Sequence, residues 1–132
     1  MATVTLLSDE EASAEALAVF DDIRATRGTE VVNNFWRALA HDPALLKATW
    51  ERLKQVMAPG ALDPLTKEMV YIAVSVANSC DYCIHSHTVS AKGKGMTPEM
   101  HHELLAVIGM ASQTNALVNA MKVPVDPAFE AE

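Results

Sequence analysis

The chain has 132 residues, which is enough for one hydrophobic core but not for a second domain. Its 17 acidic and 10 basic residues leave a net charge of −7, which argues against nucleic acid as a partner. Half of the residues are hydrophobic, a high fraction for so short a chain, and we expect other subunits to cover part of the apolar surface.

Helix caps and breakers divide the chain into six segments, and none of them alternates with the period of a β-strand. The first is expected to begin at a capping box of Ser8 and Glu11 and to run to Gly28. The later helices are expected at about residues 31–40, 43–57, 64–77, 80–92 and 98–120. The tail at 122–132 is acidic and broken by prolines, so it either docks on a neighbour or is disordered. The pattern predicts an all-α chain with a single domain over residues 1–132.

The N-terminal residues predict no targeting segment, because they lack a basic region and a long apolar core. No segment approaches the roughly 20 apolar residues that a membrane span needs. We therefore expect a cytoplasmic protein with no membrane partner. In that compartment a close cysteine pair is more often catalytic or metal-binding than a permanent disulfide.

The only two cysteines, Cys80 and Cys83, lie three residues apart, and His87 follows four residues after the second. On a helix these positions share one face, which puts the imidazole beside the Cys83 thiol. Cysteines at this spacing have Cα atoms about 5 to 6 Å apart, so a disulfide can open and close without refolding the backbone. With Asn78 or Ser79 as the N-cap, Cys80 falls in the first turn, where the helix dipole favours a thiolate. These residues predict a redox-active pair.

Glu68 is the second residue that needs an explanation. It lies in the segment 65–77, which is apolar nearly all round and is therefore expected to be buried on several sides. A buried carboxylate is costly unless it is paired or performs chemistry, because desolvation raises its pKa. A turn at residues 78–79 would let the next helix fold back and bring Glu68 close to Cys80.

The four residues Glu68, Cys80, Cys83 and His87, with spacings of twelve, three and four, resemble the core motif of the alkylhydroperoxidase AhpD-like proteins of the carboxymuconolactone decarboxylase superfamily. The resemblance covers residues 31–121. It implies an AhpD-like helical bundle with one such unit, assembled as a homotrimer or homohexamer. It also implies a thiol-dependent antioxidant oxidoreductase, in which Cys80 and Cys83 cycle between dithiol and disulfide while Glu68 and His87 relay protons.

The same resemblance implies the reaction partners. The substrate is a hydroperoxide or a disulfide, an external dithiol or protein reductant resets the enzyme, and no cofactor is needed beyond the cysteine pair. Decarboxylases of the superfamily use a site without this pair, so lactone decarboxylation is not expected. Tyr82 stands where the best-known AhpD proteins have a histidine, which removes one possible proton carrier.

Three alternatives compete with this interpretation. A zinc site could use Cys80, Cys83, His87 and one further histidine, which would be His85, His101 or His102. Glu68 could instead pair with a lysine or arginine across an interface. The chain could also be a non-catalytic binding protein with a small pocket near Glu68. Within the redox hypothesis the first attacking thiol stays open, because the helix start favours Cys80 and the adjacent His87 favours Cys83.

Overall fold

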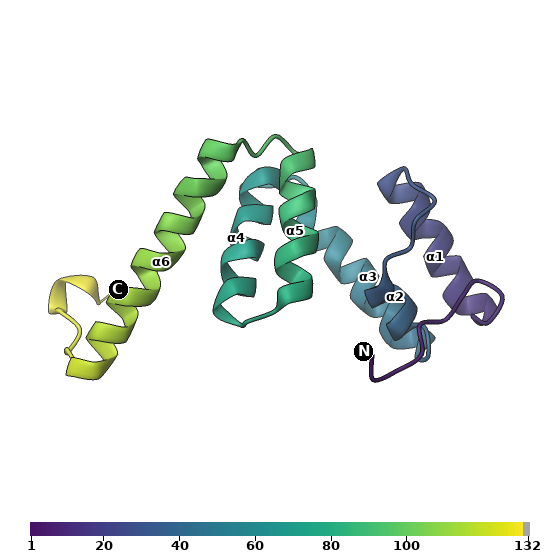
Figure 1. Cartoon of the computed structure of the whole chain (residues 1–132), viewed down its shortest axis with the longest axis horizontal. Helices are drawn as coiled ribbons and strands as arrows, with labels where there is room; N and C mark the ends of the chain where they lie inside the picture. Colours follow the sequence, from purple (N-terminus) through teal and green to yellow (C-terminus); the bar gives the residue numbers. More distant parts are fainter. Residues whose placement is uncertain (131–132) are drawn as a thin grey trace. The chain divides into compact units, whose positions relative to one another are not determined.

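The computed structural model describes residues 1–130, and over that range it contains six α-helices, one short 3-10 helix and no strand. The all-α fold predicted from the sequence is thereby confirmed. Figure 1 shows the helices in chain order. The chain divides into two compact units, Met1–Ala58 and Pro59–Glu132, and each has its own hydrophobic cluster. The expectation of one domain over residues 1–132 stays a prediction.

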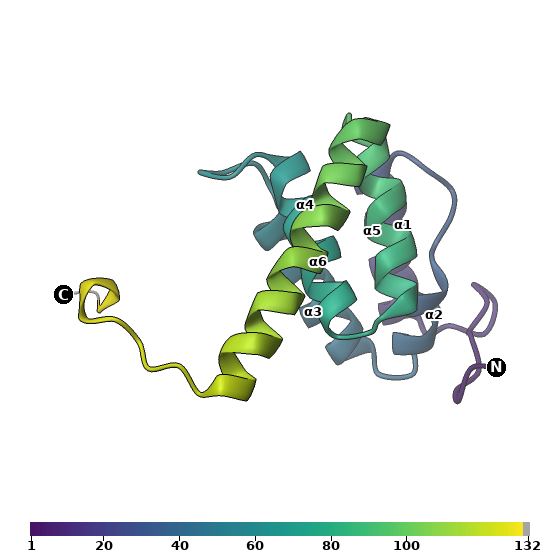
Figure 2. The ribbon, with the colours of Figure 1, turned by 60° about the vertical axis from the view of Figure 1, so that its left-hand side comes forward.

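The second unit carries the cysteine motif and is built from α4 (Pro64–Ala77), α5 (Asp81–Gly93) and α6 (Pro98–Met121). Helices α4 and α5 form an antiparallel hairpin, and α6 packs on α4 (Figures 1 and 2). Asp63 and Thr97 cap α4 and α6 through their side chains and a proline follows each cap, so both helices begin at the expected residues 64 and 98. The buried residues of this unit's hydrophobic cluster are Ile72, Ala91, Met96 and Leu104.

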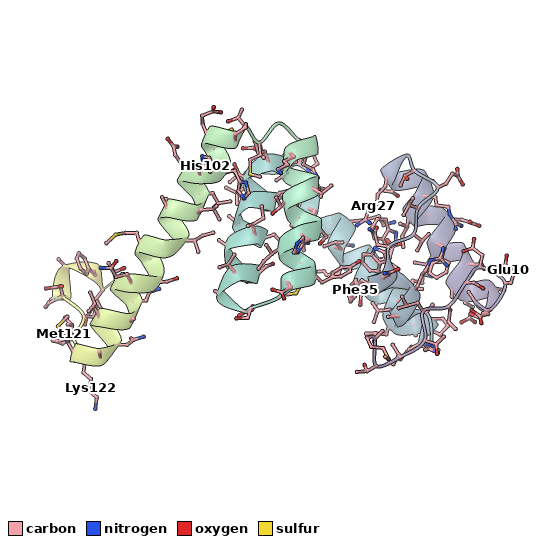
Figure 3. The ribbon with its side chains drawn as sticks, viewed as in Figure 1. Glu10, Arg27, Phe35, His102, Met121 and Lys122 are labelled. Carbon is pink, nitrogen blue, oxygen red and sulfur yellow. A yellow bond between two sulfur atoms is a disulfide. The ribbon has the colours of Figure 1, made fainter. Side chains whose placement is uncertain are left out.

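Helix α6 is long and apolar enough to cross a membrane by length and composition alone, which corrects the expectation that no segment reaches that limit. Leu104 is its only buried residue within the described chain. Five large apolar side chains share one face of its C-terminal part and are exposed: Val107, Met110, Leu117, Val118 and Met121. We call this set the exposed face of α6. Figure 3 shows Met121 beside Lys122 at the end of the helix.

The first unit consists of α1 (Ala14–Arg27), α2 (Asn34–Leu39) and α3 (Pro43–Met57), and α3 packs on both of the others. The two tryptophans, Trp36 and Trp50, are buried. Their rings meet edge to face with centroids 5.4 Å apart, a favourable arrangement for aromatic side chains. The other buried members of this cluster are Ala16, Val19, Phe20, Ile23, Val32, Ala40 and Leu46.

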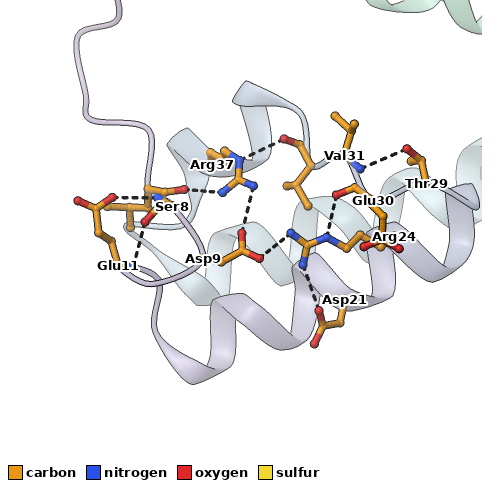
Figure 4. Close-up of polar contacts among 11 residues, drawn as sticks. Ser8, Asp9, Glu11, Asp21, Arg24, Thr29, Glu30, Val31 and Arg37 are labelled. Carbon is orange, nitrogen blue, oxygen red and sulfur yellow. Dashed lines mark hydrogen bonds and ion pairs between the residues drawn. The ribbon is translucent and has the colours of Figure 1, made fainter.

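Helix α1 begins later than the sequence predicts. Ser8 and Glu11 do exchange the two capping-box hydrogen bonds, of 2.9 and 3.3 Å (Figure 4). The turn they close does not continue, because Ser13 is extended and itself caps α1 by accepting the amide hydrogen of Ala16. The preceding segment is held instead by Asp9, which pairs with Arg24 at 2.6 Å and Arg37 at 3.1 Å.

Candidate redox site

The turn between α4 and α5 places the cysteines. Helix α4 ends with Asn78 as its C-cap, as the sequence predicts, and Ser79 then adopts a left-handed conformation with φ of 55°. The amide of Cys80 donates to the carbonyl oxygen of Ser75 at 2.9 Å. The chain therefore reverses within three residues, 78–80, and α5 runs back along α4.

Cys80 is itself the N-cap of α5, which corrects the expectation that Asn78 or Ser79 caps this helix and that Cys80 lies in its first turn. The left-handed backbone of Ser79 differs from the extended conformation of a usual N-cap, so the capping role passes to the next residue. The Cys80 Sγ accepts the amide hydrogen of Cys83 at 3.3 Å. The start of α5 thus favours negative charge on the Cys80 sulfur. It does so because Cys80 is the N-cap, and not because Cys80 lies in the first turn.

Cys80 and Cys83 are joined by a disulfide, with their Cα atoms 5.4 Å apart. This distance agrees with the 5 to 6 Å expected from the spacing. Both cysteines are partly exposed, and Tyr82 between them is 46% exposed. Part of the cysteine pair is therefore accessible to solvent.

Glu68 is buried on α4 with only 3% of its surface exposed, and α5 supplies the hydrogen-bond partners of its carboxylate. Its Oε2 accepts a hydrogen bond of 2.6 Å from His87 Nδ1. Its Oε1 accepts hydrogen bonds of 2.7 Å from both Ser90 Oγ and Lys94 Nζ. Lys94 Nζ also donates to Ser90 Oγ at 2.7 Å, so the three side chains form a closed ring of hydrogen bonds.

The electrostatic environment keeps Glu68 ionised. Burial by itself raises the pKa of this carboxyl, but hydrogen bonds from His87, Lys94 and Ser90 and the charge of Lys94 outweigh burial and lower the pKa to about 2. Desolvation thus acts on this pKa in the expected direction, and the net shift is downward because His87, Lys94 and Ser90 pair with the carboxylate. Lys94 directly follows the last residue of α5 in the same unit, so its pairing with Glu68 needs no subunit interface.

His87 is fixed in both position and tautomer. Its ring stacks on Tyr71 with centroids 3.6 Å apart and planes 20° from parallel. An ionised carboxylate can only accept hydrogen bonds, so the contact with Glu68 requires the proton on Nδ1 of His87. In the neutral imidazole the other nitrogen, Nε2, is then an acceptor that can take a proton from a thiol.

The structure brings Glu68 to His87 and not to the cysteines. Ser75, whose carbonyl oxygen accepts the Cys80 amide, lies seven residues after Glu68, about 10 Å along the α4 axis. His87 lies one turn after Cys83 on α5, as the sequence predicts. The imidazole thus contacts the carboxylate and lies one helical turn from Cys83 along α5.

Three members of this site were missed by the sequence analysis: Tyr71, Ser90 and Lys94. A signal was available, because Ser90 and Lys94 follow His87 by three and seven residues and so share its helix face. Tyr71 likewise follows Glu68 by three residues. Nothing in the spacing alone shows that the two faces meet.

The zinc alternative finds no support in the geometry. Within residues 1–130, no three side chains of the His, Cys, Asp and Glu types are grouped so that they could hold a metal ion. The two sulfur atoms that this alternative needs as ligands are bonded to each other in this structure.

The model of the carboxymuconolactone decarboxylase family matches residues 43–126, which is more than half of the chain and includes the whole cysteine motif. The chain belongs to this family. Its fold also matches the crystal structure of an alkylhydroperoxidase AhpD core from Rhodospirillum rubrum, with a TM-score of 0.96 and 66% identity over 100% of this chain and 99% of that one. The chain is therefore an AhpD-like member of the family, as the motif predicts.

Two relatives are named alkyl hydroperoxide reductase AhpD. The protein from Solibacter usitatus is 36% identical over 55% of this chain and 40% of its own length. That from Anaeromyxobacter dehalogenans is 27% identical over 96% of this chain and 65% of its own length. An uncharacterized protein of Cupriavidus necator is 32% identical over 62% of this chain and 73% of its own. The chain thus covers less than two thirds of either AhpD relative.

Proposed function

We propose that this protein is a thiol-dependent antioxidant oxidoreductase that reduces alkyl hydroperoxides, and by the same chemistry disulfides, through Cys80 and Cys83. The observation that carries the proposal is the partly exposed disulfide one helical turn from His87, whose tautomer a buried carboxylate fixes. The names of the AhpD relatives support the same activity.

In the reduced protein, Nε2 of His87 takes the proton of a cysteine thiol, and the thiolate attacks one oxygen of the hydroperoxide. A sulfur–oxygen bond forms and the oxygen–oxygen bond breaks, and the leaving alkoxide takes a proton and departs as the alcohol. The second thiol then displaces water from the sulfenic acid and closes the disulfide. The two thiols supply both electrons, and an external dithiol restores them by thiol–disulfide exchange.

Glu68 has an orienting role in this proposal. The family resemblance implies a shared acid–base role for Glu68 and His87. A carboxyl with a pKa of about 2 is a weak base at neutral pH, so we assign the proton transfer to His87. Glu68 holds the imidazole in the tautomer that leaves Nε2 as acceptor, and it stabilises the imidazolium once the proton arrives.

A single-turnover experiment tests the proposal without knowledge of the natural donor. The reduced protein is mixed with an organic hydroperoxide, and the loss of free thiols is followed together with the formation of the alcohol. We expect two thiols to be lost per alcohol formed, and the Cys83→Ser variant to form no intramolecular disulfide. Ser86→Ala, on the same helix, is the matched control. No oxidation above the rate of a free dithiol would favour a non-catalytic binding protein.

The order of attack follows from the same assay. The variant that lacks the attacking cysteine is inert toward hydroperoxide, whereas the variant that lacks the second cysteine consumes one equivalent and stops at a sulfenic acid. Comparison of Cys80→Ser with Cys83→Ser therefore assigns the two roles. Multiple turnover is then measured with dihydrolipoamide as the dithiol donor.

We further propose that the protein acts as a homotrimer or homohexamer in the cytoplasm. The exposed face of α6 supports the assembly, because its members recur at spacings of three, seven, one and three residues, and this places them on one side of the helix. Val70 and Val74 on α4 are also about half exposed. A second copy of the chain would remove both surfaces from water. The cytoplasm is a reducing compartment and could supply the dithiol.

A further inference from the structure

Lys94 is the charged partner of Glu68 that the sequence motif does not contain. It follows the last residue of α5, where its backbone N–H caps the helix. Its side chain, 39% exposed, reaches back so that Nζ lies 2.7 Å from both Glu68 Oε1 and Ser90 Oγ. The ammonium group is therefore partly in solvent, while the carboxylate it contacts is buried.

The hydrogen bonds of this group have one consistent arrangement. Lys94 can only donate, and ionised Glu68 can only accept. The single hydroxyl hydrogen of Ser90 goes to Glu68 Oε1, so the Ser90 oxygen accepts from Lys94. With Oε1 occupied by two donors, Oε2 is the oxygen directed at His87.

We propose that Lys94, together with Ser90, is a positioning residue that keeps Glu68 ionised and turned toward His87, so that the proton taken from a cysteine stops on His87. This inference rests on the proposed thiol chemistry. It assigns Lys94 no contact with the substrate. Its effect is to make Glu68 an anchor for the imidazole and to prevent Glu68 from acting as the terminal proton acceptor.

The charges around Glu68 support this role. Its partners from α5 are His87, Ser90 and Lys94, and on its own helix Tyr71 stacks on the imidazole. The residues of α6 in the hydrophobic cluster of this unit are apolar: Met100, Leu104 and Ile108. Lys94 is therefore the only fixed positive charge among these groups, and without it the hydrogen bonds from His87 and Ser90 alone would oppose the effect of burial.

The Glu68 pKa is low enough to keep the proton off this carboxyl at neutral pH. At pH 7, a carboxyl with a pKa of about 2 is protonated in roughly one molecule in 100,000. Loss of the Lys94 charge removes two of the influences that lower this pKa, which are its hydrogen bond and its charge. Burial is then opposed only by the hydrogen bonds from His87 and Ser90, so the Glu68 pKa rises and this carboxyl competes better for the proton.

Three variants test the inference. Lys94→Met removes the charge and keeps the length of the side chain, Lys94→Arg restores the charge, and Lys92→Met removes an exposed charge from the same helix as the matched control. In the reduced proteins, the rate of cysteine alkylation is measured against pH. Infrared difference spectra follow the carbonyl band of a protonated carboxyl over the same range.

We expect the pH–rate profile of Lys94→Met to show an additional inflection above about pH 4. The carbonyl band of a protonated carboxyl should appear with it, and this band should be absent from the double variant with Glu68→Gln. The alkylation rate at pH 7 should fall roughly tenfold, because a change of about one pKa unit alters the ratio of two protonation states tenfold. Lys94→Arg should restore most of the rate, and Lys92→Met should match the wild type. Ser90→Ala should shift the profile in the same direction but by less, which tests the inference even if Lys94→Met does not fold.

An unchanged profile and no new carboxyl band in Lys94→Met would overturn the inference. A slower rate at every pH with an unchanged profile would also overturn it, since that result describes a structural role alone. Alkylation needs no hydroperoxide, so these outcomes are independent of the single-turnover assay. If wild-type protein fails to reduce hydroperoxides, the proposed function fails while the role of Lys94 is still measured.

Discussion

Replacement of Glu68 by glutamine changes one atom and removes the charge, and the structure dictates how the new amide must lie. Ser90 and Lys94 both donate to Oε1, so the amide oxygen has to take that place. The amide NH2 then faces Nδ1 of His87, where it can only donate. The imidazole must become the other tautomer, with its proton on Nε2, and the nitrogen that would accept a thiol proton is lost.

The cost in stability can be estimated from the pKa of Glu68. Its lowering from an ordinary 4.5 to about 2 corresponds to about 3 kcal/mol of stabilisation of the buried carboxylate at neutral pH. Glutamine keeps the acceptor for Ser90 and Lys94, so about 3 kcal/mol is the upper end of the expected loss. Small domains have roughly 5 to 15 kcal/mol of stability, and the variant should therefore remain more than about 90% folded.

The cost in thiol reactivity should be larger. A wrong histidine tautomer lowers the rate by about 10⁴ in the serine protease triad, where an aspartate performs the same orienting role. We expect a fall of roughly 10² to 10⁴ in the rate of cysteine oxidation by hydroperoxide. Unfolding of less than about a tenth of the molecules cannot produce a loss of that size.

The two effects are measured on the same samples. Urea unfolding gives the change in free energy, and the single-turnover oxidation of the reduced protein gives the rate. Glu103→Gln, at an exposed position of α6 in the same unit, is the matched control and should change neither. A Glu68→Gln variant that oxidises within a factor of three of the wild type would refute the orienting role. A rate loss fully explained by the unfolded fraction would show that Glu68 is only a structural partner of Lys94.

Three other predictions concern reduction, acid stability and assembly. The Cys80–Cys83 disulfide closes a very short loop, so it should be reduced by mild dithiols, and a redox titration showing resistance to strong dithiols would contradict a catalytic pair. The folded-state pKa of Glu68 lies below its ordinary 4.5, so its contribution to the free energy of unfolding is complete above pH 4.5 and is lost as the pH falls toward 2. Over that range the urea midpoint of the wild type should therefore drop more steeply than that of Glu68→Gln, and parallel curves would refute this. Light scattering at micromolar concentration should give several times the chain mass, whereas a mass near 14.3 kDa would mean that the exposed face of α6 stays uncovered.

Much of the fold follows from local signals, and the sequence therefore predicts it. Asp63 and Thr97, each followed by proline, start α4 and α6 at the expected residues, because caps act through the nearest backbone amides. The separation of Cys80 and Cys83 follows from helix geometry in the same way. Local signals fail where two of them compete. The box at Ser8 forms without starting α1, since Ser13 also offers a cap.

The partners of the buried carboxylate depend on contacts that are distant in the sequence. The sequence determined that Glu68 needs a partner and that His87 lies on the helix face of the cysteines. Tertiary structure decided that the partner of one oxygen is His87 and that the partners of the other are Ser90 and Lys94. This choice is set by the register of α4 against α5, which the left-handed Ser79 and the bond from Cys80 to Ser75 fix. Because hairpin register is a property of two packed helices, neither helix encodes it alone, and the ionised state of Glu68 follows from that packing.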